Sequence, residues 1–253
     1  EFCASSVLIS GGYVQKPADR VLEEVDYLKT LKHRPFIEFA DDNSFVRKAY
    51  WKKLLPELAK RRVRWMSEGD LSMARDEELL HLMRRSGCAQ VLIGLESPVE
   101  RDLEGLDLKA NWKRFQVAGY KDAIRAIQSH GITVNGCFVL GMDSQGPEIF
   151  DAVYDFVEET ELFEVQITVL TPFPGTPLYA RLKREGRLID ETAWHKCTLY
   201  DVNFEPRGMT RKQLETGFLD LGRRLFDPAF VQWRRDRFKE NLRSLRRAAA
   251  QVD

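Results

Sequence analysis

Carboxylate side chains follow four of the five segments that the sequence predicts to be β-strands. In parallel α/β folds the working residues lie where strands end and loops begin, so these positions are candidates for chemistry. Acidic groups gathered at one rim repel one another, and a purely structural sheet does not require them. The alternative is that Asp, Asn, Ser and Gly here only begin loops and cap helices. The strand ends are Asp41-Asp42-Asn43, Ser67-Glu68-Gly69-Asp70, Glu96-Ser97, Gly141-Met142-Asp143 and, without an acid, Thr171 to Pro177.

Short apolar, β-branched or aromatic runs alternate with helical patterns along the chain. Most steps between successive runs are close to the roughly 30 residues of a βα unit. Repeated βα units give a parallel sheet with helices outside. The sequence therefore predicts an α/β fold, and spacing alone leaves open whether the sheet is a partial barrel or doubly wound. The predicted strands are 35–40, 63–66, 90–95, 133–140 and 164–170, and the predicted helices lie within 45–58, 79–83, 123–127, 147–157, 178–182, 210–225 and 227–248.

Four motifs at the strand ends match one family in the right order and at the right spacings. They resemble radical S-adenosylmethionine (SAM) proteins, in the branch that often carries an upstream cobalamin-binding domain. The resemblance covers residues 1–186 and implies a partial (β/α)6 TIM-like barrel whose first strand is missing. Residues 187–253 resemble a C-terminal extension, irregular and then helical. The motifs are Phe39-Ala40-Asp41-Asp42-Asn43, Ile93-Gly94-Leu95-Glu96-Ser97, Gly136-Cys137-Phe138-Val139-Leu140-Gly141 and Thr171-Pro172-Phe173-Pro174-Gly175-Thr176-Pro177-Leu178-Tyr179.

The opening residues Glu1-Phe2-Cys3 fit the last three positions of the family's CxxxCxΦC signature, in which Φ is aromatic. The resemblance implies that Cys3 is a cluster ligand, while three thiolates are needed to hold a [4Fe–4S] cluster. Because the chain begins with Glu rather than Met, we expect a piece of a longer protein that is inactive alone. Of the other cysteines, Cys88 and Cys137 are expected to pack in the core, and Cys197 is unassigned.

The same resemblance implies two cofactors, a [4Fe–4S] cluster and SAM, and it assigns residues to the parts of SAM. The amino group needs acceptors, a role for Asp41 or Asp42. The ribose hydroxyls need a carboxylate or hydroxyl, which Glu96 and Ser67 would supply. The adenine needs backbone contacts and a flat apolar wall. For this wall the candidates are Phe2, Phe173, Pro174 and the strand that ends at Gly141.

The activity that the resemblance implies is cleavage of SAM to a 5′-deoxyadenosyl radical. Methyl transfer to a small or lipid-like substrate is the expected outcome if an upstream domain binds cobalamin, with flavodoxin or ferredoxin as reductant. One alternative is a decayed, non-catalytic binding module on the same fold. Another is an RNA-modifying member of the family. A hydrolase or aldolase-like barrel is disfavoured because the sequence has no nucleophile elbow, phosphate loop or Schiff-base lysine context.

The amino-acid composition limits the classes of binding partner that we expect. Lys plus Arg and Asp plus Glu both number 39, so no global field favours nucleic acid or an anionic membrane. No apolar run approaches the roughly 20 residues of a membrane span. The four scattered cysteines fit a reducing cytoplasm. The basic stretch 234–247 is expected to be the solvated face of a terminal helix, and Trp194, Tyr200 and Phe204 are expected to anchor the irregular region.

The topology predicts where the acidic strand ends lie. Parallel strands joined by right-handed crossovers all end on one side, so Asp41, Glu68, Glu96 and Asp143 should meet at one mouth near Cys3. The strand that begins at Pro35 should form an unpaired border. An exposed apolar edge favours pairing with another chain, so we expect the chain to associate.

Overall fold

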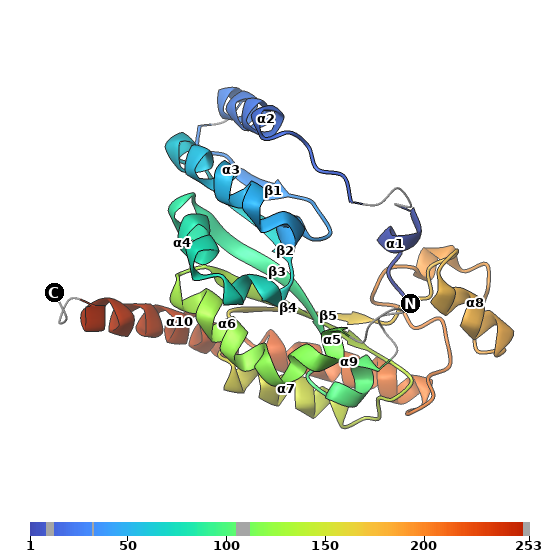
Figure 1. Ribbon diagram of the computed structural model, residues 1–253. Coiled ribbons are helices and arrows are strands. Elements are labelled where there is room, and N and C mark those ends of the chain that lie inside the picture. The colour runs from blue at the N-terminus through green and yellow to red at the C-terminus, as the bar shows by residue number, and fades with distance from the viewer. Residues whose placement is uncertain (9–12, 32, 105–111, 250–253) are drawn as a thin grey trace. The chain divides into compact units, whose positions relative to one another are not determined.

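A computed structural model describes residues 1–8, 13–31, 33–104 and 112–249 (Figure 1). Five strands form one sheet in the order β1-β2-β3-β4-β5, and β2 pairs in parallel with both β1 and β3. The α/β fold with a parallel sheet is therefore confirmed. The strands are β1 Phe36–Phe39, β2 Arg64–Gly69, β3 Cys88–Glu96, β4 Thr133–Leu140 and β5 Glu164–Val169.

Helices lie between the strands where the sequence predicts them, and three further helices, α1, α2 and α5, were not predicted. The five 3-10 segments are η1 Ser44–Arg47, η2 Leu71–Arg75, η3 Glu100–Leu103, η4 Val117–Gly119 and η5 Trp194–Lys196. The α-helices are α1 Ser5–Leu8, α2 Ala18–Leu31, α3 Lys48–Arg61, α4 Glu77–Arg85, α5 Trp112–Gln116, α6 Tyr120–Ser129, α7 Ile149–Glu159, α8 Pro177–Arg184, α9 Arg211–Leu225 and α10 Pro228–Ala249. None of these described helices is long and apolar enough to cross a membrane.

The chain divides into two compact units that interleave in sequence. The first unit comprises Glu1–Ser10, Leu95–Gly119 and Cys137–Arg235. The second unit comprises Gly11–Gly94, Tyr120–Gly136 and Asp236–Asp253. These segments do not follow the predicted boundary between residues 186 and 187, which stays a prediction.

In the second unit, an aromatic cluster joins α3 to the sheet. Trp51 of α3 stacks on Trp65 of β2 with ring centroids 5.9 Å apart, and Phe39 of β1 meets both rings edge-on. The indole of Trp65 donates to the carbonyl of Ser86 at 3.1 Å, so this buried polar atom is satisfied. Large aromatic side chains bury some 150–250 Å² each, and this cluster packs the end of β1 and the start of β2 against α3.

In the first unit, α7 and α9 cover β4 and β5. Phe138 of β4 meets Phe156 of α7 edge-on at 5.8 Å. Gly217 of α9 lies against Phe150 of α7, where an added Cβ would be 2.0 Å from the ring. This glycine therefore allows the two helices to pack closely. Leu214, Leu221 and Leu225 of α9 are buried.

One expectation for the C-terminal region is wrong, and another holds except at one residue. Trp194 and Tyr200 are 69% and 59% exposed, so of the three expected anchors Phe204 alone is buried. The expected solvated basic face is found at Arg235, Lys239, Arg243 and Arg247, which are exposed, but Arg234 is 2% exposed. Its Nη2 donates to the carbonyl of Leu225 at 2.9 Å, and burial lowers the pKa of its guanidinium.

Candidate functional site

Strand alternation gives β2 in the second unit two different faces. Trp65 and Ser67 point to the face that α3 covers, and both are fully buried. Met66 and Glu68 lie on the opposite face and are half-buried. Glu38 of β1 is aligned with Met66 in the parallel register, so it shares this second face. We call the face with Glu38, Met66 and Glu68 the open face of the second unit.

Acidic groups gather where the open face reaches the ends of β1 and β2. Burial raises the pKa of Glu68, and the nearby charges of Asp42 and Glu38 raise it further. Asp42 and Glu38 are themselves exposed. The three carboxylates Glu38, Asp42 and Glu68 form an acidic cluster whose repulsion a cationic ligand would relieve.

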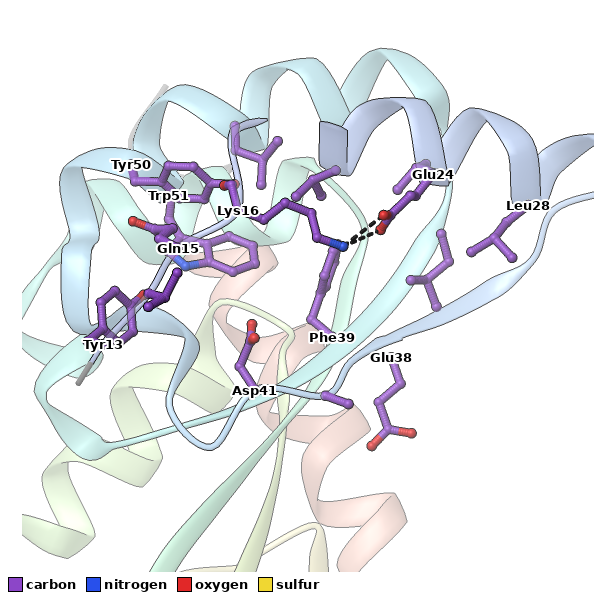
Figure 2. Close-up of a pocket in the computed structure, with 16 residues that line it drawn as sticks. Tyr13, Gln15, Lys16, Glu24, Leu28, Glu38, Phe39, Asp41, Tyr50 and Trp51 are labelled. Atoms are coloured by element: carbon purple, nitrogen blue, oxygen red, sulfur yellow. Dashed lines mark hydrogen bonds and ion pairs between the residues drawn. The ribbon is translucent and has the colours of Figure 1, made fainter. Parts of the chain in front are cut away.

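Asp41 lies apart from this cluster, in a cavity beside β1. The cavity has a volume of about 280 Å³ and lies between the segment that begins at Tyr13, α2 and β1. Figure 2 shows the carboxylate of Asp41 pointing into this cavity and the carboxylate of Glu38 pointing away from it. Asp41 also accepts a hydrogen bond from Ser44 Oγ at 3.1 Å. Of the two aspartates predicted to hold an amino group, Asp42 is therefore the one whose charge acts on Glu68.

Ser67 and Asn135 each carry a buried oxygen without a hydrogen-bond partner in the part of the chain that the structure describes. Ser67 Oγ is on the helix-covered face, which places it away from the acidic cluster. Asn135 lies between the buried Val134 and Gly136 of β4, so its half-buried side chain is on the other face of that strand. An unpaired buried amide oxygen is costly, and a bound polar ligand would satisfy it.

In the first unit, Glu96 ends β3 in a left-handed conformation with φ of 65°. Glu96 is 8% exposed, and its Oε1 accepts a hydrogen bond from Lys113 Nζ of α5. The ion pair compensates the burial of the carboxylate. Positive φ is uncommon for a residue with a side chain, and it turns Glu96 out of the regular strand direction.

The residue after Glu96 joins a buried network that the sequence did not indicate. Asp102 is 4% exposed and accepts hydrogen bonds from Ser97 Oγ at 2.7 Å and from Ser144 Oγ at 2.9 Å. This carboxylate therefore ties the end of β3 to the loop that follows β4. No residue pattern marks Asp102, because its partners are 5 and 42 residues away.

The loop after β4 is held in place by Gln145, which is 1% exposed. Its Oε1 accepts hydrogen bonds from the backbone N–H groups of Gly141 at 2.7 Å and Met142 at 3.0 Å, while its Nε2 donates to the carbonyl of Val139. Gly141 has φ of 98°, a region that favours glycine. An added Cβ at Gly141 would lie 2.8 Å from Leu214 of α9. Both the conformation and the lack of space for a side chain therefore require glycine at this strand end.

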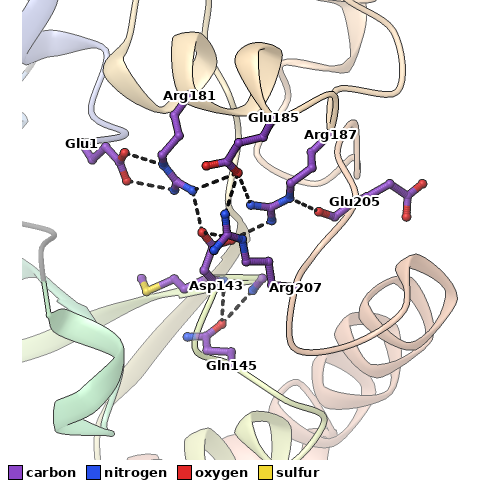
Figure 3. A network of polar contacts seen from close by, with 10 residues as sticks. Glu1, Asp143, Gln145, Arg181, Glu185, Arg187, Glu205 and Arg207 are labelled. Atoms are coloured by element: carbon purple, nitrogen blue, oxygen red, sulfur yellow. Dashed lines mark hydrogen bonds and ion pairs between the residues drawn. The ribbon is translucent and has the colours of Figure 1, made fainter.

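Asp143 is not a free carboxylate. It accepts hydrogen bonds from Arg181 Nη1 and from Arg187 Nη2, both at 2.6 Å (Figure 3). Burial raises the pKa of Asp143, but the two guanidinium groups outweigh it and hold the pKa below its usual value. The acid at this strand end is therefore part of an ion-pair network.

The four other residues predicted for the cofactor site in the first unit lie at the N-terminus and before α8. Cys3 is exposed and Phe2 is half-buried. Phe173 is half-buried and Pro174 is exposed, in the loop before α8. Because the predicted set is divided between the two units, the expected common mouth stays a prediction. The first unit holds Phe2, Cys3, Glu96, Gly141, Phe173 and Pro174, and the second holds Asp41, Asp42 and Ser67.

Residues 1–157 match the family model of the radical SAM superfamily. This chain belongs to the radical SAM superfamily. Residues 176–252 match a domain of unknown function, DUF4070. The expected family is therefore confirmed, and the C-terminal region carries a match of its own.

Two relatives of this radical SAM protein are methyltransferases. The chain is 28% identical to the bacteriochlorophyllide d C-12(1)-methyltransferase of Chlorobaculum tepidum, over 92% of this chain and 50% of that protein. It is 28% identical to the hopanoid C-2 methylase of Rhodopseudomonas palustris, over 76% of this chain and 37% of that protein. The chain thus spans half or less of the length of these relatives.

The fold also matches a solved structure. The radical SAM methyltransferase TsrM of Kitasatospora setae, solved with cobalamin and a [4Fe–4S] cluster bound, has a TM-score of 0.59 and 21% identity. The match covers 68% of this chain and 32% of TsrM. At this identity the match supports the partial barrel fold of the family.

The cofactors of a radical SAM protein are a [4Fe–4S] cluster and SAM. The described residues contain no group of three His, Cys, Asp or Glu side chains that would hold a metal ion. Cys3 is exposed, whereas Cys88 is buried and burial raises the pKa of its thiol, so these two cannot act together as ligands. For the cluster, the residues present supply one ligand and do not form a complete site. For SAM they fit better, because the acidic cluster and Asn135 offer acceptors that have no cationic partner in the described part of the chain.

Proposed function

We propose that this radical SAM protein acts in methyl transfer to a small or lipid-like substrate. The relatives support this proposal, because they are named for methylation of bacteriochlorophyllide d and of hopanoid. TsrM was solved with cobalamin bound, which supports cobalamin as a third cofactor that a further part of a longer protein would bind. When bound, the cluster and SAM supply the one-electron chemistry, and the protein positions and shields them.

One observation carries the cofactor assignment: Glu38 and Glu68 share the open face near Asp42, where the charges of Asp42 and Glu38 act on Glu68. Among the described residues, no ion pair links these three carboxylates to a cation. This arrangement is unfavourable for the protein alone, and a bound ammonium group relieves it. The amino group of SAM has this charge. We therefore assign Asp42 and Glu68 to the amino group. Ser67, which was expected near the ribose hydroxyls, is left out because it lies on the helix-covered face.

In the first unit, we assign Glu96 to the ribose and the Gly141 loop to the adenine. Glu96 would accept hydrogen bonds from the ribose hydroxyls, sharing or exchanging its bond with Lys113. The loop after Gly141 would present backbone groups to the adenine, because Gln145 holds it in one conformation. Phe2, Phe173 and Pro174 stay candidates for the apolar wall, and Cys3 for the cluster.

The test is SAM binding by the full-length, anaerobically reconstituted protein. We expect Asp42→Asn and Glu96→Gln each to weaken binding about 10- to 150-fold, since a lost charge-assisted contact costs about 1.5–3 kcal/mol. Isothermal titration calorimetry gives the affinity directly. Asp201→Asn is the matched control, because Asp201 is exposed and accepts a hydrogen bond from the nearby Thr198 Oγ1. Unchanged affinity in both site variants would remove these residues from the cofactor site.

A further inference from the structure

An ion-pair network in the first unit joins the segment of Cys3 to the end of β4 (Figure 3). Arg181 of α8 donates from Nε to Glu1 Oε1 at 2.7 Å and from Nη2 to Glu1 Oε2 at 3.1 Å. Its third nitrogen, Nη1, donates to Asp143 Oδ2 at 2.6 Å. One planar guanidinium thus holds two carboxylates at once, a geometry that the single ammonium of a lysine cannot reproduce.

Glu1 is held through its backbone as well as its side chain. The N–H of Leu178, in the first turn of α8, donates to the carbonyl of Glu1 at 3.2 Å. This turn is itself fixed by Thr176, whose Oγ1 caps the N–H of Tyr179 at 3.2 Å. Cys3 follows Glu1 by two residues. Because the backbone carbonyl and the carboxylate of Glu1 are both held by hydrogen bonds, Cys3 has little conformational freedom.

The other end of the network is equally fixed. Arg187 donates from Nη2 to the second oxygen of Asp143 at 2.6 Å and from Nε to the carbonyl of Glu205 at 2.8 Å. The same loop contains Gln145, which orients the N–H of Gly141. Both carboxylate oxygens of Asp143 are thus occupied by arginines, and the loop cannot turn independently of α8.

The charges within the network are balanced, which distinguishes it from a ligand site. Glu185 accepts from Arg187 at 2.9 Å and pairs with Arg207 at 3.0 Å. Three arginines therefore pair with three acids. Each of these side chains is oriented by ion pairs within the protein rather than by a ligand. The acids are Glu1, Asp143 and Glu185, and the arginines are Arg181, Arg187 and Arg207.

We propose that Arg181 is a positioning residue that sets where Cys3 lies relative to the Gly141 end of β4. This inference rests on the proposed function, in which Cys3 binds the cluster and the Gly141 loop faces the adenine of SAM. Cluster and SAM must meet at a fixed distance, and a loose terminal segment would not maintain it. Arg181 ties the two together through Glu1 and Asp143.

The first test measures the segment itself and needs no cofactor. In Arg181→Met and in Glu1→Gln, we expect amide hydrogen exchange in residues 1–8 to rise about tenfold, the equilibrium effect of one lost charged contact. The rate of alkylation of the Cys3 thiol, measured by mass spectrometry, should rise in the same two variants. Arg187→Met is the matched control, because it also removes a bond to Asp143 but none to Glu1.

Equal loosening in the Arg187→Met control would show that the network contributes stability only and would overturn the positioning role. Unchanged exchange in Arg181→Met would overturn it as well. Iron content of the reconstituted full-length protein separates this inference from the proposed function. Arg181→Met should lower it partially and Cys3→Ser strongly. If Cys3→Ser has no effect while Arg181→Met still loosens residues 1–8, the cluster assignment fails and the restraint on the segment stands.

Discussion

The pKa of Glu68 is raised mainly by burial of its carboxyl group. The charges of Asp42 and Glu38 raise it further. Replacing Asp42 by Asn removes one negative charge, so we expect the pKa of Glu68 to fall towards its ordinary value of about 4.3. Carbon-13 NMR of the labelled carboxyl group measures this shift. Burial remains in the variant, so the pKa should stay above the ordinary value.

Asp26→Asn provides the control for this titration, because Asp26 pairs with Arg61 and does not act on Glu68. A pKa of Glu68 that is the same in Asp42→Asn as in the unchanged protein would mean that the acidic cluster is not coupled. In that case the assignment of the SAM amino group to Asp42 and Glu68 loses its support.

Asp143 shows the opposite behaviour, because two guanidinium groups hold its pKa below the ordinary value. Its contribution to stability is therefore present above the unfolded-state pKa of about 3.9 and is lost as pH falls through the lower folded-state pKa. We expect Asp143→Asn to reduce the free energy of unfolding by about 1–2 kcal/mol at pH 7, a range discounted for partial exposure. Urea unfolding at pH 7 and pH 3 checks this. A difference between variant and unchanged protein that is no smaller at pH 3 than at pH 7 would contradict it.

At the scale of elements, strand alternation explains which parts of the fold the sequence predicts. All five strands and the helices that follow them were predicted, because buried strands and helix faces have strong apolar periodicity. α2 was missed, and Val25 is its one buried residue, so its apolar pattern is weak. Asp102 and Arg181 were missed for a different reason. Their roles depend on partners far away in sequence, which local patterns do not reveal.

β1 is at the border of the sheet, as predicted, and pairs with β2 alone among the described strands. Phe36 on this strand is 54% exposed. An exposed strand edge with an apolar side chain favours pairing between chains, so we expect concentration-dependent association. Phe36→Lys should reduce association, because a lysine at an edge opposes strand pairing. Light scattering over a concentration series measures it.

Val46→Lys is the control for this prediction, because Val46 is 55% exposed but lies in η1, outside the strand. If both lysine variants reduce association equally, the effect comes from net charge and not from the strand edge. A chain that stays monomeric at all concentrations would show that the edge is already protected.

At the scale of the whole molecule, the two units are each assembled from three separate segments. The C-terminal region is therefore part of the structure that supports the site. Leu214 of α9 lies against Gly141 at the end of β4, and Phe204 lies against the same glycine. The loop proposed to face the adenine thus depends on residues beyond 187, and a protein cut at the predicted domain boundary would lose this support.

The ligand count of the whole chain leads to the last prediction. Three thiolates hold a [4Fe–4S] cluster, and Cys3 is the one cysteine of this chain at a position of the family signature. Cys88 is buried with a raised pKa, and the pKa of Cys197 is raised by burial as well, so neither favours the thiolate. We therefore expect the 253-residue chain to retain far fewer than four irons per chain after anaerobic reconstitution. Iron and sulfide analysis measures this content. Cys3→Ser should change this value little. Near-stoichiometric loading with four irons would show that the ligands are other than those assigned here, and visible absorption of the cluster in the Cys3→Ser variant would then exclude Cys3 itself.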